Sequence, residues 1–112
     1  MPKQKRSKEK TVYLVVKREY FDAFADGTKT SEYRQASPHW IDRIDDDVTD
    51  VVFQLGYGRN GQPPKRMRFK VKEVRIQDTL HNVEIAYPKR KEDIPNGFRA
   101  CLIRIVLGER LM

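Results

Sequence analysis

The sequence is poor in the residues that build disulfide scaffolds and metal centres. It has one cysteine, Cys101, and two histidines, His39 and His81. A single cysteine cannot form an internal disulfide, and neither histidine has a partner at the spacing of a zinc site. We therefore expect no metal, no cofactor and a reducing, cytoplasmic location. Cys101 lies in an apolar run, where we expect it to pack as a small hydrophobic residue.

Long apolar runs are also absent. No segment approaches the ~20 apolar residues of a transmembrane helix, and the basic N-terminus is not followed by the apolar core of a secretory signal. The sequence contains no P-loop, dinucleotide-binding glycine motif or serine-nucleophile elbow. We expect no association with a membrane, and the oligomeric state stays open.

Acidic residues are outnumbered by basic ones, 16 against 23, which gives a net charge of +7. Much of this excess lies in residues 1–10, which carry five cations and one anion and no apolar residue after Met1. We predict a disordered basic tail over residues 1–10 and one folded domain over residues 11–112. The tail either improves solubility or binds nucleic-acid phosphates.

The first half of the domain has clear helix and strand patterns. The β-branched run 11–16 predicts a buried strand. Apolar residues recur at helical spacing in residues 18–26, and Gly27 stands where a helix would stop, so a short amphipathic helix is predicted there. Residues 28–34 predict a polar extended strand. Residues 40–44 could form one helical turn, with Trp40 as a plug at the edge of the core.

The second half predicts further strands. An acidic loop over residues 45–50 leads to an apolar strand over 51–55, and Gly and Pro then mark a turn over 56–64. Apolar and basic residues alternate from Met67, with a bulge expected near Glu73. Residues 78–97 predict irregular structure, and 98–107 a final strand. The fold class is mostly β with one or two short helices (α+β), a small, largely antiparallel barrel with a helix packed against it.

The most informative stretch is Gly27-x-Lys29-x-x-Glu32-x-Arg34. In a strand, Glu32 and Arg34 lie two residues apart and share a face, together with Thr30. They could form a fixed pair that offers a ligand both an acceptor and a planar donor group. Strand alternation would place Lys29 on the opposite face, but Lys29 comes just after the end of the helix and could reach the same cleft. The alternative is a solvated, charged strand.

This motif, placed after a strand and a short helix, resembles the signature of the ASCH domain. Pro38-x-Trp40, Phe53-x-x-Gly56-Tyr57-Gly58 and the segment 67–74 are similar to those of short ASCH proteins from phages and prophages. The resemblance covers residues 11–107. It implies a PUA-like β-barrel associated with RNA, with the ligand site between the helix and the motif strand.

The resemblance implies an RNA- or nucleotide-binding module that recognises a base or modified nucleoside. We expect its ligand-binding residues to be Lys29, Thr30, Glu32, Arg34 and Tyr57. The alternative is an enzyme, either a hydrolase of the N4-acetylcytidine type or a ribonuclease, in which Lys29 and Glu32 would be catalytic. The related amidohydrolases have a threonine three residues after the lysine, where this chain has Glu32. Their downstream glutamate could correspond to Glu73 or Glu84.

Other residues allow a functional and a structural interpretation. Tyr57, between two glycines, could stack on a base or cover the end of the barrel. The basic residues Arg59, Arg68, Lys70 and Lys72 could follow a nucleic-acid backbone, with the last three aligned on one strand face, or form a solvated surface. Asp45, Asp46 and Asp47 lack the alternation of an EF-hand and predict a charged turn rather than a metal site.

Overall fold

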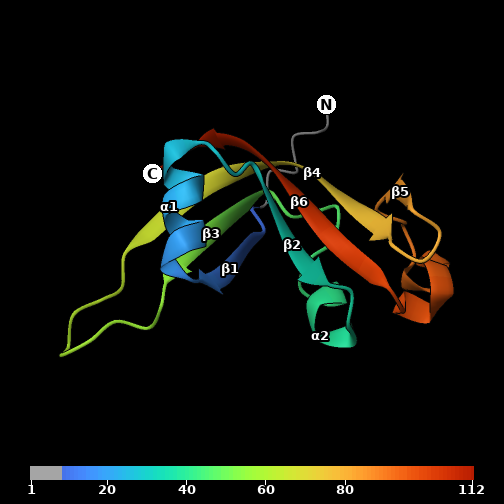
Figure 1. Ribbon diagram of the computed structural model, residues 1–112, viewed down its shortest axis with the longest axis horizontal. Helices are drawn as coiled ribbons and strands as arrows, with labels where there is room; N and C mark the ends of the chain where they lie inside the picture. Colours follow the sequence, from blue (N-terminus) through green and yellow to red (C-terminus); the bar gives the residue numbers. More distant parts are fainter. Residues whose placement is uncertain (1–8) are drawn as a thin grey trace.

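The computed structural model describes residues 9–112, which form one curled β-sheet with short helices packed on it (Figure 1). The elements in chain order are β1 (Thr11–Val16), α1 (Arg18–Asp26), β2 (Ser31–Gln35), α2 (Pro38–Ile41), β3 (Asp50–Leu55), β4 (Arg66–Asp78), β5 (Val83–Ala86), two 3-10 turns, η2 (Lys91–Asp93) and η3 (Pro95–Phe98), and β6 (Cys101–Arg110).

The sheet has the strand order β1-β3-β4-β6-β2, and β5 pairs with β4. The β1–β3 pair is parallel and every other pair is antiparallel. The sheet curls into a half-barrel, with β1 and β2 as its two edges. The expected fold class, mostly β with two short helices, is therefore confirmed.

The core lies on the inner face of this curl. Alternate residues of β1 and β6 are buried there, as the period of two of a strand requires. Helix α1 covers this face near β3, where the Phe24 ring stacks on the Phe53 ring with centroids 4.0 Å apart. Such aromatic pairs add about 1 kcal/mol beyond the area they bury. The helix is therefore fixed against the sheet by its apolar face.

Several predicted elements are confirmed residue by residue. Strand β1 spans 11–16 and helix α1 spans 18–26. Gly27 ends the helix at φ +84°, a conformation that favours glycine, and its N–H donates to the carbonyl of Phe24. The expected bulge is present in β4, where the register with β6 shifts on both sides of Val71. Val74 and Ile76 thereby return to the buried face.

Other expectations were wrong. Residues 78–97 are not irregular throughout, because Val83–Ala86 form β5 on the outer part of β4. The last strand begins at Cys101 rather than residue 98, since Phe98 and Ala100 have φ of +78° and +53° and cannot extend a strand. Asp50 belongs to β3, where it is buried, and not to the acidic loop.

The short helix α2 also differs from the predicted turn at 40–44. It begins at Pro38, because the Ser37 hydroxyl accepts a hydrogen bond from the Trp40 N–H and Pro38 suits the first helical position. Trp40 is half-buried against the core. Ser37-Pro38 is the sequence signal for this start, because Ser favours the N-cap position and Pro the first position of a helix.

The predicted disordered tail falls mainly on residues 1–8, which lie outside the described residues. Glu9 and Lys10 both contact the folded domain. The Lys10 ammonium lies 2.6 Å from an Asp45 carboxylate oxygen, and its backbone N–H donates to the Thr49 hydroxyl. Within residues 9–112 no helix is long and apolar enough to cross a membrane.

Candidate functional site

The motif occupies the turn from α1 into β2. After Gly27, the Lys29 N–H donates to the carbonyl of Ala23 at 3.1 Å, which ties the turn to the last part of the helix. The Thr30 carbonyl then accepts a hydrogen bond from the Leu107 N–H, and β2 begins at Ser31. Lys29 thus precedes regular strand geometry, which frees its side chain from the strand's alternation.

A cavity of about 430 Å³ opens where β1 ends, beside α1 and β2. This volume lies in the range of small-molecule sites. The cavity is lined by Val15, Val16, Lys17, Tyr20, Lys29, Glu32, Tyr33, Arg34 and Gln35. The structure therefore brings Lys29, Glu32 and Arg34 together in one concave site beside α1.

Glu32 and Arg34 form an ion pair on the inner face of the sheet. The Arg34 Nε donates to the Glu32 Oε2 at 2.8 Å, and the two side chains are only 20% and 10% exposed. Arg34 also donates through Nη2 to the Val15 carbonyl at 3.2 Å and lies 4.9 Å from the Trp40 ring. These contacts fix the pair across the gap between the two sheet edges. Among the described residues, only Oε2 of Glu32 accepts a hydrogen bond.

Lys29 lies among aromatic rings. Its ammonium is 5.4–5.6 Å from the ring centroids of Tyr20, Phe24 and Tyr33. Cation–π contacts of this kind contribute about 0.5–2 kcal/mol each, depending on desolvation. Within the described part of the chain Lys29 makes no ion pair, so its N–H groups stay available to a ligand.

Two tyrosines in this cavity were missed by the sequence reasoning. Tyr20 and Tyr33 are 44% and 38% exposed, so each presents part of its ring to solvent. Tyr20 fits the helical spacing of apolar residues in α1, and strand alternation places Tyr33 on the face opposite Glu32. Tyr33 lies inside the motif between Glu32 and Arg34, and this position is the signal that could have found it. Tyr20 lies on α1, before the motif, and no local pattern connects it with Lys29.

Two predicted ligand residues are not part of the cavity. Thr30 is exposed and does not line it, because β2 starts one residue later and the alternation does not extend back to Thr30. Tyr57 is 83% exposed on the β3–β4 connection. It does not line this cavity either.

The predicted backbone-binding residues are dispersed. Arg68 is held by Asp50, with 2.5 Å between Nε and Oδ2, and by Glu9 at 3.3 Å. The hydrogen bond with Asp50 raises the pKa of Arg68. Lys70 and Lys72 are exposed on β4, but the register shifts around Val71 interrupt their alternation. Arg59 lies elsewhere, on the β3–β4 connection.

The two downstream glutamates lie outside the cavity. Glu84 of β5 accepts hydrogen bonds from Gln77, Arg75 and Arg104. The bond from Gln77, with those from the two arginines, lowers the pKa of Glu84 despite its partial burial. Glu73 pairs with Arg75 at 3.0 Å in the same network. Neither glutamate lines the α1–β2 cavity.

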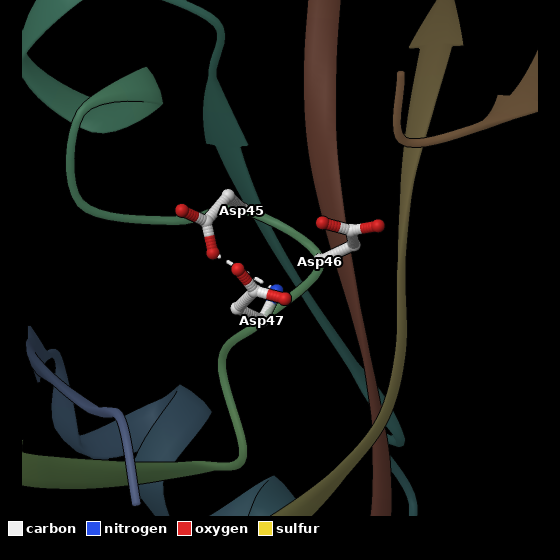
Figure 2. Close-up of side chains that lie close together, drawn as sticks. All are labelled: Asp45, Asp46 and Asp47. Atoms are coloured by element: carbon white, nitrogen blue, oxygen red, sulfur yellow. Dashed lines mark hydrogen bonds between the residues drawn. The ribbon is translucent and has the colours of Figure 1, made fainter. Parts of the chain in front are cut away.

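The acidic turn brings three carboxylates close together, as Figure 2 shows for Asp45, Asp46 and Asp47. One oxygen from each lies within 4.8 Å of the others. Asp45 is already engaged, because it accepts a hydrogen bond from the Asp47 N–H and pairs with Lys10. Asp46 and Asp47 are exposed. The cluster caps its own loop and ties it to the start of β1.

Comparison with known proteins identifies no relative of this chain. The chain matches no protein-family description, no curated protein and no solved structure. The resemblance to ASCH domains therefore depends on the residues of the motif and of the segments beside it.

Proposed function

We propose that this protein is an RNA- or nucleotide-binding domain of the ASCH type that takes a base or modified nucleoside into the α1–β2 cavity. One observation carries the proposal: Lys29, Glu32 and Arg34 line a single cavity of about 430 Å³. The shared strand face of Glu32 and Arg34 and the resemblance to the ASCH signature both predict one site, so the convergence of these side chains with Lys29 on one concave site supports a ligand-binding role.

The chemistry of the lining suits a nucleoside. The free Glu32 oxygen accepts a hydrogen bond from an N–H group of a base, and Arg34 holds that carboxylate in a fixed orientation. Tyr20 and Tyr33 offer ring faces on which a base stacks. The Lys29 ammonium donates to a base carbonyl or a phosphate. Each group thus has a complementary partner on a nucleotide.

Binding is favoured over hydrolysis by the position of the carboxylates. Hydrolysis needs a base that activates water near the scissile bond. Among residues 9–112, Glu32 is the only glutamate or aspartate that lines the cavity, and its Oε2 is engaged by Arg34. Glu73 and Glu84 both lie outside, so the described residues place no second carboxylate in the cavity to share the proton transfers.

The variant Glu32→Gln tests the proposal, with Glu84→Gln as a matched control that also removes an arginine-paired carboxylate. We expect Glu32→Gln to weaken the best-bound member of a nucleoside and mononucleotide panel about tenfold or more, because a buried charged hydrogen bond is lost. Weakly bound members should change less, so selectivity falls. Glu84→Gln should stay within about twofold. Calorimetric titration at two salt concentrations measures both variants.

Glu32 cannot contact a phosphate favourably, so the salt dependence of binding should be the same in Glu32→Gln and the unmodified protein. Uniformly tighter binding with unchanged selectivity would mean that Glu32 only positions Arg34. Mass spectrometry of the recovered ligands checks the chemistry. Release of acetate from N4-acetylcytidine, or cleavage of RNA, would replace binding by hydrolysis as the function.

A further inference from the structure

A second hollow of about 460 Å³ lies at the start of α1, against the base of the β3–β4 connection. It is lined by Arg18, Leu55, Arg59, Asn60, Gln62, Pro63 and Lys65. We call it the basic hollow, because three of these side chains are cationic and none is acidic. The connection itself, residues 56–65, extends away from the sheet in Figure 1.

The basic hollow is next to the α1–β2 cavity for a topological reason. The parallel β1–β3 register sets Val16 opposite Leu55, so the chain leaves β1 beside the point where β3 ends. The next two residues, Lys17 and Arg18, then separate: Lys17 lines the α1–β2 cavity and Arg18 lines the basic hollow. The two sites are therefore lined by consecutive residues at the start of α1.

The cations of the basic hollow and Lys17 have no carboxylate partner among the described residues. Within residues 9–112, none of Lys17, Arg18, Arg59 and Lys65 forms an ion pair. Three arginines of β4 and β6 behave differently, since Arg68, Arg75 and Arg104 are each paired with a carboxylate. Lys70 and Lys72 of β4 are exposed and also lack an ion pair within residues 9–112, but they line neither the α1–β2 cavity nor the basic hollow. Apart from Lys29, the unpaired cations next to the α1–β2 cavity are therefore those of the basic hollow and Lys17.

The connection that carries Arg59 is itself ordered by local contacts. Arg59 and Gln62 form a β-bridge, and the Gln62 N–H donates to the Arg59 carbonyl at 2.8 Å. Gly58 has φ +81°, and a Cβ added there would lie 2.4 Å from the Gln62 carbonyl oxygen. Glycine is therefore required for this close approach. Arg59 therefore lies on a turn whose backbone conformation is fixed by these contacts.

We propose that the basic hollow binds backbone phosphates that flank the nucleotide held in the α1–β2 cavity, so that the ligand of this protein is single-stranded RNA rather than a free nucleotide. This inference rests on the proposed function of the adjacent cavity. Unpaired cations beside a nucleotide-sized cavity give the combination of phosphate contacts and base contacts that single strands require. The apolar lining, Leu55 and Pro63, is too small to enter a lipid surface.

The double variant Arg59→Ala/Lys65→Ala tests the inference against the competing pair Lys70→Ala/Lys72→Ala, which removes the same charge from β4. The probes are the four 5′-mononucleotides, a mixed-sequence RNA of about nine nucleotides, and vesicles rich in phosphatidylglycerol. Each lost phosphate contact lowers the slope of log K against log salt by roughly 0.7 on a single strand. Arg59→Ala/Lys65→Ala should therefore flatten the slope by about 1.4.

We expect the same double variant to weaken RNA binding roughly ten- to thirtyfold at 0.1 M salt, while mononucleotide affinity stays within about twofold. Lys70→Ala/Lys72→Ala should weaken RNA binding clearly less than Arg59→Ala/Lys65→Ala does. A larger loss in this second pair would move the phosphate path to β4 and overturn the inference.

Three other outcomes would also overturn it, and they differ in what they say of the cavity. If the RNA binds no tighter than a mononucleotide, the basic hollow is not used and the proposed nucleotide site stands. If neither probe binds, the proposed function itself is wrong. If the vesicles bind and Arg59→Ala/Lys65→Ala abolishes that binding without affecting RNA, the partner is an anionic lipid surface.

Discussion

Two buried carboxylates, Glu32 and Asp50, each pair with an arginine, but their surroundings differ. Asp50 also accepts hydrogen bonds from the hydroxyls of Thr11 and Thr49, so both of its oxygens are occupied. Glu32 accepts one hydrogen bond among the described residues and faces a cavity. A buried polar atom without a partner is costly, so an open acceptor in a cavity indicates a ligand site. Asp50 is therefore structural and Glu32 is the functional candidate.

The variant Asp50→Asn tests the structural role of this residue. Asparagine keeps the shape but loses the charge that Arg68 and the two threonines share. We expect the free energy of unfolding to fall by about 2 kcal/mol at pH 7, since hydrogen bonds to a buried charge are lost. Urea unfolding followed by circular dichroism measures the change. Loss of nucleotide binding without loss of stability would contradict the assignment.

The stability difference should depend on pH. Burial raises the pKa of Asp50, but hydrogen bonds from Thr49, Arg68 and Thr11 outweigh it and hold the pKa below its ordinary value of 3.8. A carboxyl whose pKa falls on folding stabilises the protein above its unfolded pKa, and this contribution is lost as pH falls through the folded-state value. The unmodified protein should therefore exceed Asp50→Asn in free energy of unfolding by the full amount above about pH 5, and this difference should shrink below about pH 4. A difference that grows on acidification would contradict the lowered pKa of Asp50.

At the scale of elements, the α1–β2 unit sets the position of Lys29. The helix is held by Phe24 on Phe53, and the left-handed Gly27 turns the chain so that the Lys29 N–H returns to Ala23. Lys29 thereby enters the cavity from the helix side while Glu32 enters from the strand. Lys29 and Glu32 are three residues apart in the sequence. They can face the same cavity because Lys29 lies in the turn after α1, before the regular alternation of β2 begins.

The variant Gly27→Ala tests this dependence. A Cβ at Gly27 meets no atom within 4 Å, so the cost is the left-handed backbone alone, about 1 kcal/mol, or a Tm lower by roughly 4–8 °C. We also expect weaker nucleotide binding, because relaxation of the turn displaces Lys29. Gly61→Ala is the control: Gly61 has φ +75° with equal space around it, but it lies in the β3–β4 connection. Mononucleotide affinity should be unchanged there.

At the scale of the whole molecule, the half-barrel has two edge strands, β1 and β2, that do not pair with each other. Unpaired edges expose backbone groups to solvent and to other chains. Arg34 on β2 donates to the Val15 carbonyl on β1, so one side chain links the two edges. Glu32 holds the same guanidinium. One ion pair therefore both lines the α1–β2 cavity and links the two edges of the sheet.

The variant Arg34→Lys should loosen this closure. Lysine keeps the charge but cannot donate to Glu32 and Val15 from one planar group. We expect a loss of about 1–2 kcal/mol in the free energy of unfolding and faster hydrogen exchange in β1 and β2. Arg104→Lys is the matched control, because Arg104 also bonds to β2, through Ser31, but joins it to Glu84 instead of β1. Equal acceleration of exchange in β1 by both variants would show that Arg34 does not link the edges.

The sequence by itself determined the local features. Six β-branched and apolar residues specified β1, helical spacing followed by Gly27 specified α1 and its end, and the broken alternation after Val71 indicated the bulge. Spacing also placed Glu32 and Arg34 on one strand face, and the position of Lys29 after the helix stop left it within reach of them. These features depend on residues within about eight positions of one another, where backbone sterics and side-chain periodicity decide the outcome.

Only the tertiary structure decided which charges are free and which are paired. Arg68 looked like part of a basic strip, but it meets Asp50, 18 positions away in the sequence, because β3 and β4 pair. Tyr20 and Tyr33 join Lys29 only after α1 packs on the sheet. Arg18 and Lys65 share a hollow because β1 runs parallel to β3. Strand pairing and helix packing between residues distant in the sequence set these contacts, and local sequence patterns do not specify them.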